Sequence, residues 1–275
     1  MSKYKTLWNY INNCGKEAAT LTFEEIGKIA GVPIDHSFLR YKKELTEYGY
    51  EVKKISMKAQ TVTFEKTIIY NTLVLYIHGK GGTAEEAEHY KPLFPGCDVV
   101  GLDYRAETPW DAKAEFAVAF QTLSAEYTRV ILIANSIGAY FSMCALPQEK
   151  IKKAYFISPI VDMEKLIGNM MGWANVAEDD LREKETIETA FGETLSWEYL
   201  CYVRSHPFSW TVPTEILYGG QDNLTDRKTI TAFANAQEAA LTVMENGEHW
   251  FHTPEQMKFL DTWIIRCENA EKESV

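Results

Sequence analysis

The sequence predicts an α/β protein in which a mostly parallel sheet carries helices on both faces, preceded by a small α+β module. From residue 73 onward, short apolar runs alternate with stretches of helical periodicity. Strands that are apolar along their whole length are typical of a parallel sheet covered on both faces. Residues 1–66 have a different pattern, with three short helical stretches and a hairpin. We therefore expect two domains, 1–66 and 67–275.

The larger domain should contain six strands and the helices between them. The predicted strands cover 73–77, 98–102, 130–134, 154–157, 215–217 and 241–244. Helical periodicity covers 111–127, 136–146 and 225–235. Residues 161–207 interrupt the alternation, since Met and Trp recur there at helical spacing without a strand pattern. We interpret this interval as a helical cap insertion, and its apolar side chains favour a hydrophobic substrate.

The smaller domain should consist of three helices and a hairpin. The expected helices cover 4–13, 22–31 and 35–49, and the expected hairpin pairs 52–57 with 61–64. Thr22 and Glu25 have the spacing of a capping box, which marks a helix start, and Asp35 is the expected N-cap of the third helix. This order of elements is winged-helix-like, but the hairpin could instead open the large sheet and blur the boundary near residue 66.

Charge and cysteine content restrict the partners and the compartment. The net charge is −11, and the five cysteines include no C-x-x-C pair. Residues 1–66 hold 11 Lys or Arg and 8 Asp or Glu, about +3, whereas the remainder holds 17 and 31, about −14. An acidic main body argues against nucleic acid or an anionic membrane as its partner. With no apolar run of membrane length and no secretory signal, we expect a cytoplasmic protein with reduced thiols.

A candidate nucleophile follows the third predicted strand of the larger domain. The sequence Val-Ile-Leu-Ile-Ala-Asn-Ser-Ile-Gly at 130–138 passes from a buried strand through Ser136 into a helix. Small residues on both sides, here Ala134 and Gly138, are typical of a nucleophile elbow, a tight turn that raises the serine hydroxyl above the sheet. Ala134 departs from the Gly that is usual at the first of these positions.

A glycine-rich loop follows the first strand of this domain. It contains His78-Gly79-Lys80-Gly81-Gly82, and its glycines would let the backbone approach a reacting carbonyl closely. A phosphate loop is the rival interpretation, but the G-x-x-x-x-G-K-[ST] spacing is absent.

An acid and a base follow the last two strands. Asp222 lies in Gly219-Gly220-Gln221-Asp222 after one strand, and His249 follows Gly247-Glu248 after the next. Ser136, Asp222 and His249 therefore each follow a predicted strand, in that chain order. Asp226 is an alternative acid. Glu248, His249 and His252 could suggest a metal, but the string is not H-E-x-x-H.

Together these motifs resemble the α/β-hydrolase family over residues 67–275. The resemblance implies a Ser136–His249–Asp222 catalytic triad and an oxyanion hole formed by the backbone N–H groups of Lys80 and Ile137. It also implies supporting roles for His78, Gly79, Gly81, Gly82 and Gly138. The expected activity is carboxylesterase-like cleavage of a small, hydrophobic carboxylic ester, or of a thioester or amide, without a metal or cofactor.

Residues 1–66 are similar to a small helix-rich module of unknown function found in bacterial proteins. The matching pieces are Phe23-Glu24-Glu25-Ile26 and Val62-Thr63-Phe64-Glu65. The third helix and the hairpin carry basic residues with glutamates among them, so we favour a packing or partner-binding module, including self-association, over a DNA reader.

Two other functions remain open on the sequence alone. One is a non-catalytic protein of this fold that binds a ligand or a partner. The other is a sensor whose N-terminal module binds nucleic acid.

Overall fold

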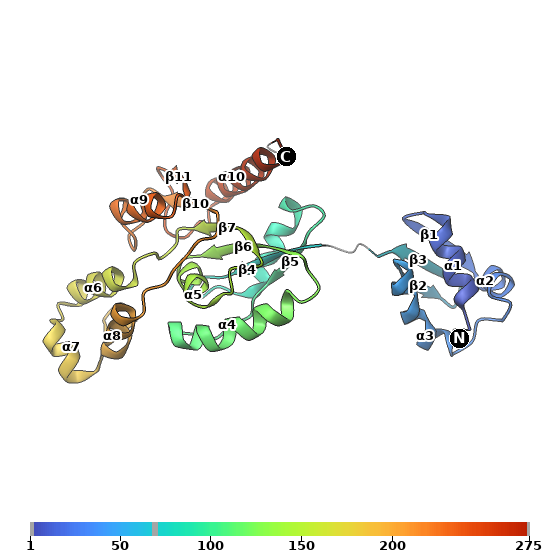
Figure 1. Ribbon diagram of the computed structural model, residues 1–275, viewed down its shortest axis with the longest axis horizontal. Coiled ribbons are helices and arrows are strands. Elements are labelled where there is room, and N and C mark those ends of the chain that lie inside the picture. Colours follow the sequence, from blue (N-terminus) through green and yellow to red (C-terminus); the bar gives the residue numbers. More distant parts are fainter. Residues whose placement is uncertain (1–2, 68–70, 274–275) are drawn as a thin grey trace. The chain divides into compact units, whose positions relative to one another are not determined.

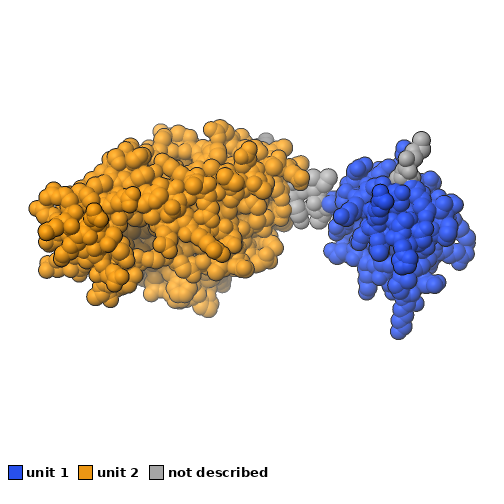
Figure 2. Space-filling view, turned by 90° about the horizontal axis from the view of Figure 1, so that it is seen from below, with its two compact units in different colours: residues 1–69 blue, residues 70–275 orange. Residues whose placement is uncertain are grey.

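The computed structural model describes residues 3–67 and 71–273, and the chain forms two compact units, residues 1–69 and 70–275 (Figure 2). The domain boundary expected from the sequence lies at residue 66. Each unit has its own buried apolar core.

The first unit packs helices against a three-stranded antiparallel sheet of order β1-β3-β2 (Figure 1). Its elements are α1 (Lys5–Cys14), β1 (Ala18–Thr22), α2 (Phe23–Ala30), α3 (Phe38–Tyr41), the 3₁₀ helix η1 (Lys42–Tyr48), β2 (Tyr50–Ser56) and β3 (Thr61–Lys66). The capping box at the start of α2 is confirmed, because Thr22 and Glu25 exchange side-chain-to-backbone hydrogen bonds. Trp8, Phe38 and Phe64 are fully buried between the helices and the sheet.

Two details of this unit differ from the sequence prediction, and a third decides an alternative that the sequence left open. Strand β1 was not predicted, since Leu21 is its one large apolar residue. The third helix begins at Phe38 rather than after Asp35, because the Asp35 carboxylate accepts the N–H of Ser37 and closes a turn ahead of the helix. The hairpin does not open the large sheet, because β3 pairs with β2 on one side and with β1 on the other.

The second unit is built on a six-stranded parallel sheet of order β11-β10-β7-β6-β4-β5 (Figure 1). The strands are β4 (Thr72–Ile77), β5 (Asp98–Gly101), β6 (Arg129–Asn135), β7 (Ile151–Ile157), β10 (Thr214–Gly219) and β11 (Ala240–Met244). The helices outside the cap are the 3₁₀ helix η2 (Ala84–Leu93), α4 (Pro109–Leu123), α5 (Ile137–Ala145), α9 (Arg227–Ala236) and α10 (Pro254–Glu273). All six predicted strands are present.

Helices cover both faces of this sheet, as predicted. Successive side chains of a strand point to opposite faces, so Leu73 and Leu75 of β4 face the core shared with α4, α5 and α9. Val74 and Tyr76 face the opposite core, which η2 and α10 close. β4 is therefore buried on both sides, which explains its uninterrupted apolar sequence from Leu73 to Ile77.

The cap connects β7 to β10 and contains α6 (Met163–Ala174), α7 (Glu178–Lys184) and α8 (Trp197–Ser205). It also contains a two-stranded hairpin, β8 (Thr186–Glu188) with β9 (Thr194–Ser196), which the sequence did not predict. Strands of three residues are too short to show an alternating pattern. The cap side chains Met163, Leu166, Ile167, Met171 and Leu200 are buried in the main core. Among the described residues, no helix is both long and apolar enough to cross a membrane.

We expect Leu132→Ala to lower the free energy of unfolding of the second unit by about 2–5 kcal/mol. Leu132 is fully buried in β6, so the substitution removes apolar contacts and leaves a cavity. Denaturant unfolding measures the change. Val118→Ala is the control, because Val118 is 67% exposed on α4 and alanine favours helix. Equal losses in the two variants would contradict this account of the core.

Candidate active site

The four motifs predicted from the sequence meet at one edge of the large sheet. His78 follows β4, Ser136 follows β6, Asp222 follows β10 after a short loop, and His249 follows β11. Because the strands are parallel, their carboxyl ends lie together, and this edge is where open α/β sheets place their functional loops.

Ser136 has a strained backbone at the point where β6 turns into α5. Its φ is 49° and its ψ is −121°, an arrangement that residues other than glycine seldom adopt. The Ser136 N–H donates to the carbonyl of Ile157 at 3.0 Å, and its own carbonyl accepts the N–H of Ile160 at 3.1 Å. Both bonds tie the turn to the chain that leaves β7, so the surrounding structure holds the strained conformation.

Gly138 allows α5 to start this close to the neighbouring strand. A Cβ atom at Gly138 would lie 2.3 Å from the carbonyl oxygen of His78 and 2.9 Å from that of Ile77. The small residue that the elbow motif requires is therefore explained by contact with the end of β4.

Ser136, His249 and Asp222 form one chain of hydrogen bonds. Ser136 Oγ lies 2.8 Å from His249 Nε2, and His249 Nδ1 lies 2.8 Å from Asp222 Oδ2. The His249 side chain is 15% exposed and that of Asp222 is fully buried. The hydroxyl thus has an acceptor nitrogen, and the opposite nitrogen faces a carboxylate.

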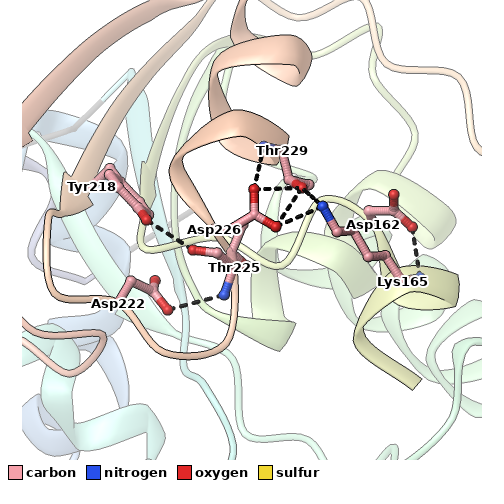
Figure 3. A network of polar contacts seen from close by, with 7 residues as sticks. All are labelled: Asp162, Lys165, Tyr218, Asp222, Thr225, Asp226 and Thr229. Carbon is pink, nitrogen blue, oxygen red and sulfur yellow. Dashed lines mark hydrogen bonds and ion pairs between the residues drawn. The ribbon is translucent and has the colours of Figure 1, made fainter. Parts of the chain in front are cut away.

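Two backbone amides fix the Asp222 carboxylate, and Figure 3 shows the one from Thr225. The N–H groups of Leu224 and Thr225 donate to Oδ1 at 2.8 and 3.0 Å, which leaves Oδ2 directed at His249. The buried Tyr218 hydroxyl donates to the carbonyl of Thr225 at 2.8 Å and so holds the same loop. A buried charge needs such partners, because its water has been removed.

The loops that carry Asp222 and His249 interlock through glycines. The Gln221 N–H donates to the Gly247 carbonyl, and the Gly220 N–H donates to that of Met244, both at 2.8 Å. A Cβ atom at Gly219 would lie 2.3 Å from the Glu248 carbonyl oxygen. These glycines had no predicted role, although Gly219 stands three residues before Asp222 and Gly247 two residues before His249.

Asp226, the alternative acid, lies elsewhere. It caps α9 by accepting the Thr229 N–H at 2.9 Å and pairs with Lys165 of the cap at 2.6 Å (Figure 3). The hydrogen bond from Lys165 holds the pKa of the Asp226 carboxyl at about 2. The structure therefore places Asp222, and not Asp226, against His249.

The loop after β4 lies directly against the elbow. The Gly82 N–H donates to the Gly79 carbonyl at 3.1 Å, and Gly81 has a φ of 76°, so Gly79–Gly82 form a turn that requires glycine at its third position. A Cβ atom at Gly79 would lie 3.2 Å from Ser136 Cβ. The Lys80 ammonium forms an ion pair with Glu193 of the cap hairpin.

His78 supports this loop from below. Its ring stacks on Tyr104 at 4.1 Å, and the Tyr104 hydroxyl donates to the His78 carbonyl at 2.7 Å. Burial raises the pKa of Tyr104 above its usual range, so the hydroxyl remains a donor. Tyr104 follows β5, and its contacts with His78 give it a structural role at this edge of the sheet.

Two further features bear on what the site can bind. Within the part of the chain that the structure describes, no three His, Cys, Asp or Glu side chains are grouped to hold a metal ion. A depression of about 620 Å³ lies in the cap, lined by Lys165, Met171, Leu200 and Arg204 among others, but neither Ser136 nor His249 lines it.

Comparison with known proteins identifies the fold of the second unit. No protein-family model and no curated protein matches the chain. Est1E from Butyrivibrio proteoclasticus is similar in structure, with 15% identity, a TM-score of 0.57, and coverage of 74% of this chain and 88% of Est1E. Alpha/beta hydrolase domain-containing protein 10 from mouse has 14% identity, a TM-score of 0.55, and coverage of 80% and 93%. The chain has the α/β-hydrolase fold.

We expect Gly138→Ala to damage both stability and the Ser136 turn. The added methyl group meets backbone atoms that cannot rotate away, so the free energy of unfolding should fall by about 1–3 kcal/mol. Gly168→Ala on α6 is the control, since a Cβ atom there meets nothing within 4 Å. Thermal unfolding measures both variants, and the explanation fails if Gly138→Ala is as stable as the parent.

Proposed function

We propose that this protein is a serine hydrolase that cleaves a carboxylic ester, with Ser136, His249 and Asp222 as its catalytic triad. The hydrogen-bonded chain from Ser136 Oγ through His249 to the buried Asp222 carboxylate carries the proposal. The fold and the placement of all three residues after parallel strands support it.

His249 activates the nucleophile in this mechanism. A serine hydroxyl is a poor nucleophile at neutral pH unless a base takes its proton as it attacks. His249 Nε2, 2.8 Å from Oγ, accepts that proton while Oγ forms a bond to the substrate carbonyl carbon. The same nitrogen then returns the proton to the departing alcohol.

Asp222 selects the reactive form of His249. Its Oδ2 accepts a hydrogen bond from Nδ1–H, so the proton of the neutral ring stays on Nδ1 and Nε2 is free to act as the base. When His249 becomes positively charged, the carboxylate stabilises the imidazolium. The two amides on Oδ1 keep the carboxylate from turning away during these changes.

The backbone N–H groups of Lys80 and Ile137 are the proposed oxyanion donors. Ile137 is the first residue of α5, where amides have no partner within the helix and favour negative charge. The turn that contains Lys80 lies against Ser136 through Gly79. A negative oxygen that develops beside Ser136 would thus receive donors from both loops.

Water completes the cycle. After the alcohol leaves, a water molecule gives a proton to His249 and attacks the acyl-enzyme carbonyl. Collapse of this second intermediate releases the acid and returns the proton to Ser136 Oγ. Thioesters and amides can follow the same steps with a thiol or an amine as the leaving group. Assays with all three substrate types are therefore needed to tell which bond the protein cleaves.

Exposed aromatic residues favour an apolar group on the substrate. Trp250, directly after His249, is 71% exposed. Trp173 and Phe191 of the cap form an edge-on ring pair with centroids 6.1 Å apart, and both are exposed. Phe191 lies in the turn of the cap hairpin, and Glu193 of the same turn pairs with Lys80 in the loop after β4. Because this pair brings the aromatic turn to the loop beside Ser136, we expect a substrate with a hydrophobic or aromatic acyl or alcohol group.

Labelling with a fluorophosphonate tests the nucleophile. We expect one adduct on the parent protein by intact mass and none on Ser136→Ala, whose ester hydrolysis should fall at least about 10⁴-fold. Ser205→Ala is the control, because Ser205 lies at the end of α8 and bonds to the Cys201 carbonyl.

An unlabelled parent that also fails to cleave small activated esters would leave a ligand-binding protein as the better proposal. An acyl-chain series with p-nitrophenyl esters then tests the apolar preference, and turnover of acetyl or charged substrates alone would contradict it.

Asp222→Asn and Asp226→Asn separate the two candidate acids. We expect about a 10⁴-fold loss of kcat for Asp222→Asn, because the amide favours the wrong tautomer of His249. Asp226→Asn should retain activity within a few-fold, because Asp226 contacts Lys165 and Thr229 and not His249. Steady-state kinetics on one ester decides, and a larger loss for Asp226→Asn would reverse the assignment.

A further inference from the structure

A buried tyrosine joins the two loops that meet at Ser136. Tyr76, near the end of β4, is 1% exposed. Asn135 Nδ2 donates to the Tyr76 hydroxyl at 2.8 Å, and this hydroxyl in turn donates to Glu86 Oε2. A single side chain of the sheet thus connects the residue before the nucleophile to a carboxylate on η2.

Glu86 carries the connection into the loop after β4. Its other oxygen, Oε1, accepts the N–H of Thr83 at 3.2 Å, as part of the capping box that begins η2. A Cβ atom at Gly82 would lie 2.8 Å from the same oxygen. Gly82 is therefore small because the carboxylate lies against the loop.

The network begins where the strand pairing ends. β4 and β6 are hydrogen-bonded up to the pair Ile77 and Ala134, and beyond it the chains separate into the glycine-rich loop and the elbow. Asn135 is the residue between that last pair and Ser136. Beyond that pair the two loops meet by close packing, as at Gly79 and Ser136, and the hydrogen bonds of Tyr76 add a polar tie between them.

We infer that Tyr76, together with Asn135 and Glu86, positions the oxyanion hole by holding the loop of Lys80 and the elbow of Ile137 at a fixed separation. This inference rests on the proposed function. Tyr76, Asn135 and Glu86 are positioning residues, because they act through the backbone of the two loops.

The chemistry of the network suits this role. Burial, followed by the nearby Tyr90 and Glu86, raises the pKa of Tyr76 far above its usual range. The hydroxyl therefore stays protonated at every working pH and continues to donate to Glu86. The ring of Tyr76 also packs on Tyr90, with centroids 5.1 Å apart, so phenylalanine can keep the packing while it removes the hydroxyl.

Tyr76→Phe in the full chain is the test. Small displacements of catalytic groups cost up to about 10²-fold in rate, so kcat should fall about 10- to 100-fold with KM within about twofold. The affinity for a boronic acid, which mimics the tetrahedral intermediate, should fall by the same factor as kcat/KM. A merely structural role would lower the unfolding temperature without this parallel loss.

Tyr155→Phe is a matched control. Tyr155 is fully buried on β7, and its hydroxyl donates to Glu268 of α10 at 2.6 Å, so it repeats the same chemistry away from the two loops. It should lose a similar amount of stability and keep its kcat. Glu86→Gln retains one acceptor oxygen and should lose less activity than Glu86→Ala.

The outcomes separate this inference from the proposed function. If the parent is labelled at Ser136 and cleaves esters, but Tyr76→Phe keeps the parent kcat or Tyr155→Phe loses as much, the inference is wrong and the hydrolase stands. If the parent is neither labelled nor active, the hydrolase proposal fails and the inference fails with it.

Discussion

The change from strand to helix within the single residue Ser136 is the constraint on which the site depends. Its positive φ directs the chain from β6 into α5 without a loop, and bonds to the segment after β7 hold it there. The helix can begin at that point only because Gly138 has no side chain to meet the carbonyl of His78. The strained turn at Ser136, the absence of a side chain at Gly138 and the position of the end of β4 therefore depend on one another.

Most of the second unit could be predicted because its information is local in the sequence. Each strand contains a short apolar run, and Ser136, Asp222 and His249 stand within a few residues of such a run, with small residues nearby. In a parallel sheet the carboxyl ends of the strands lie at one edge. Residues that follow different strands can therefore be predicted to lie close together. The chain order of the three residues added the remaining constraint.

The parts that were not predicted depend on short elements or on distant pairs. Strands β1 and β8 carry too few large apolar residues to show a period. The bond from Asn135 to Tyr76 joins residues 59 apart, and Tyr76 within its apolar run looks like an ordinary core residue. Glu86 resembles any exposed helix-capping glutamate until its partner is known. Such polar ties become visible only when the fold is known.

The cap is the only chain connection between β7 and β10 rather than an addition to a finished loop. These two strands are parallel neighbours, with Ile157 beside Leu217, so the chain must return from the carboxyl edge to the amino edge before Thr214. Parallel neighbours need a crossover of about a dozen residues or more, so some connection of this kind is required between β7 and β10. Changes of length or sequence within this crossing would therefore leave the ends of β6, β10 and β11, which precede Ser136, Asp222 and His249, in place.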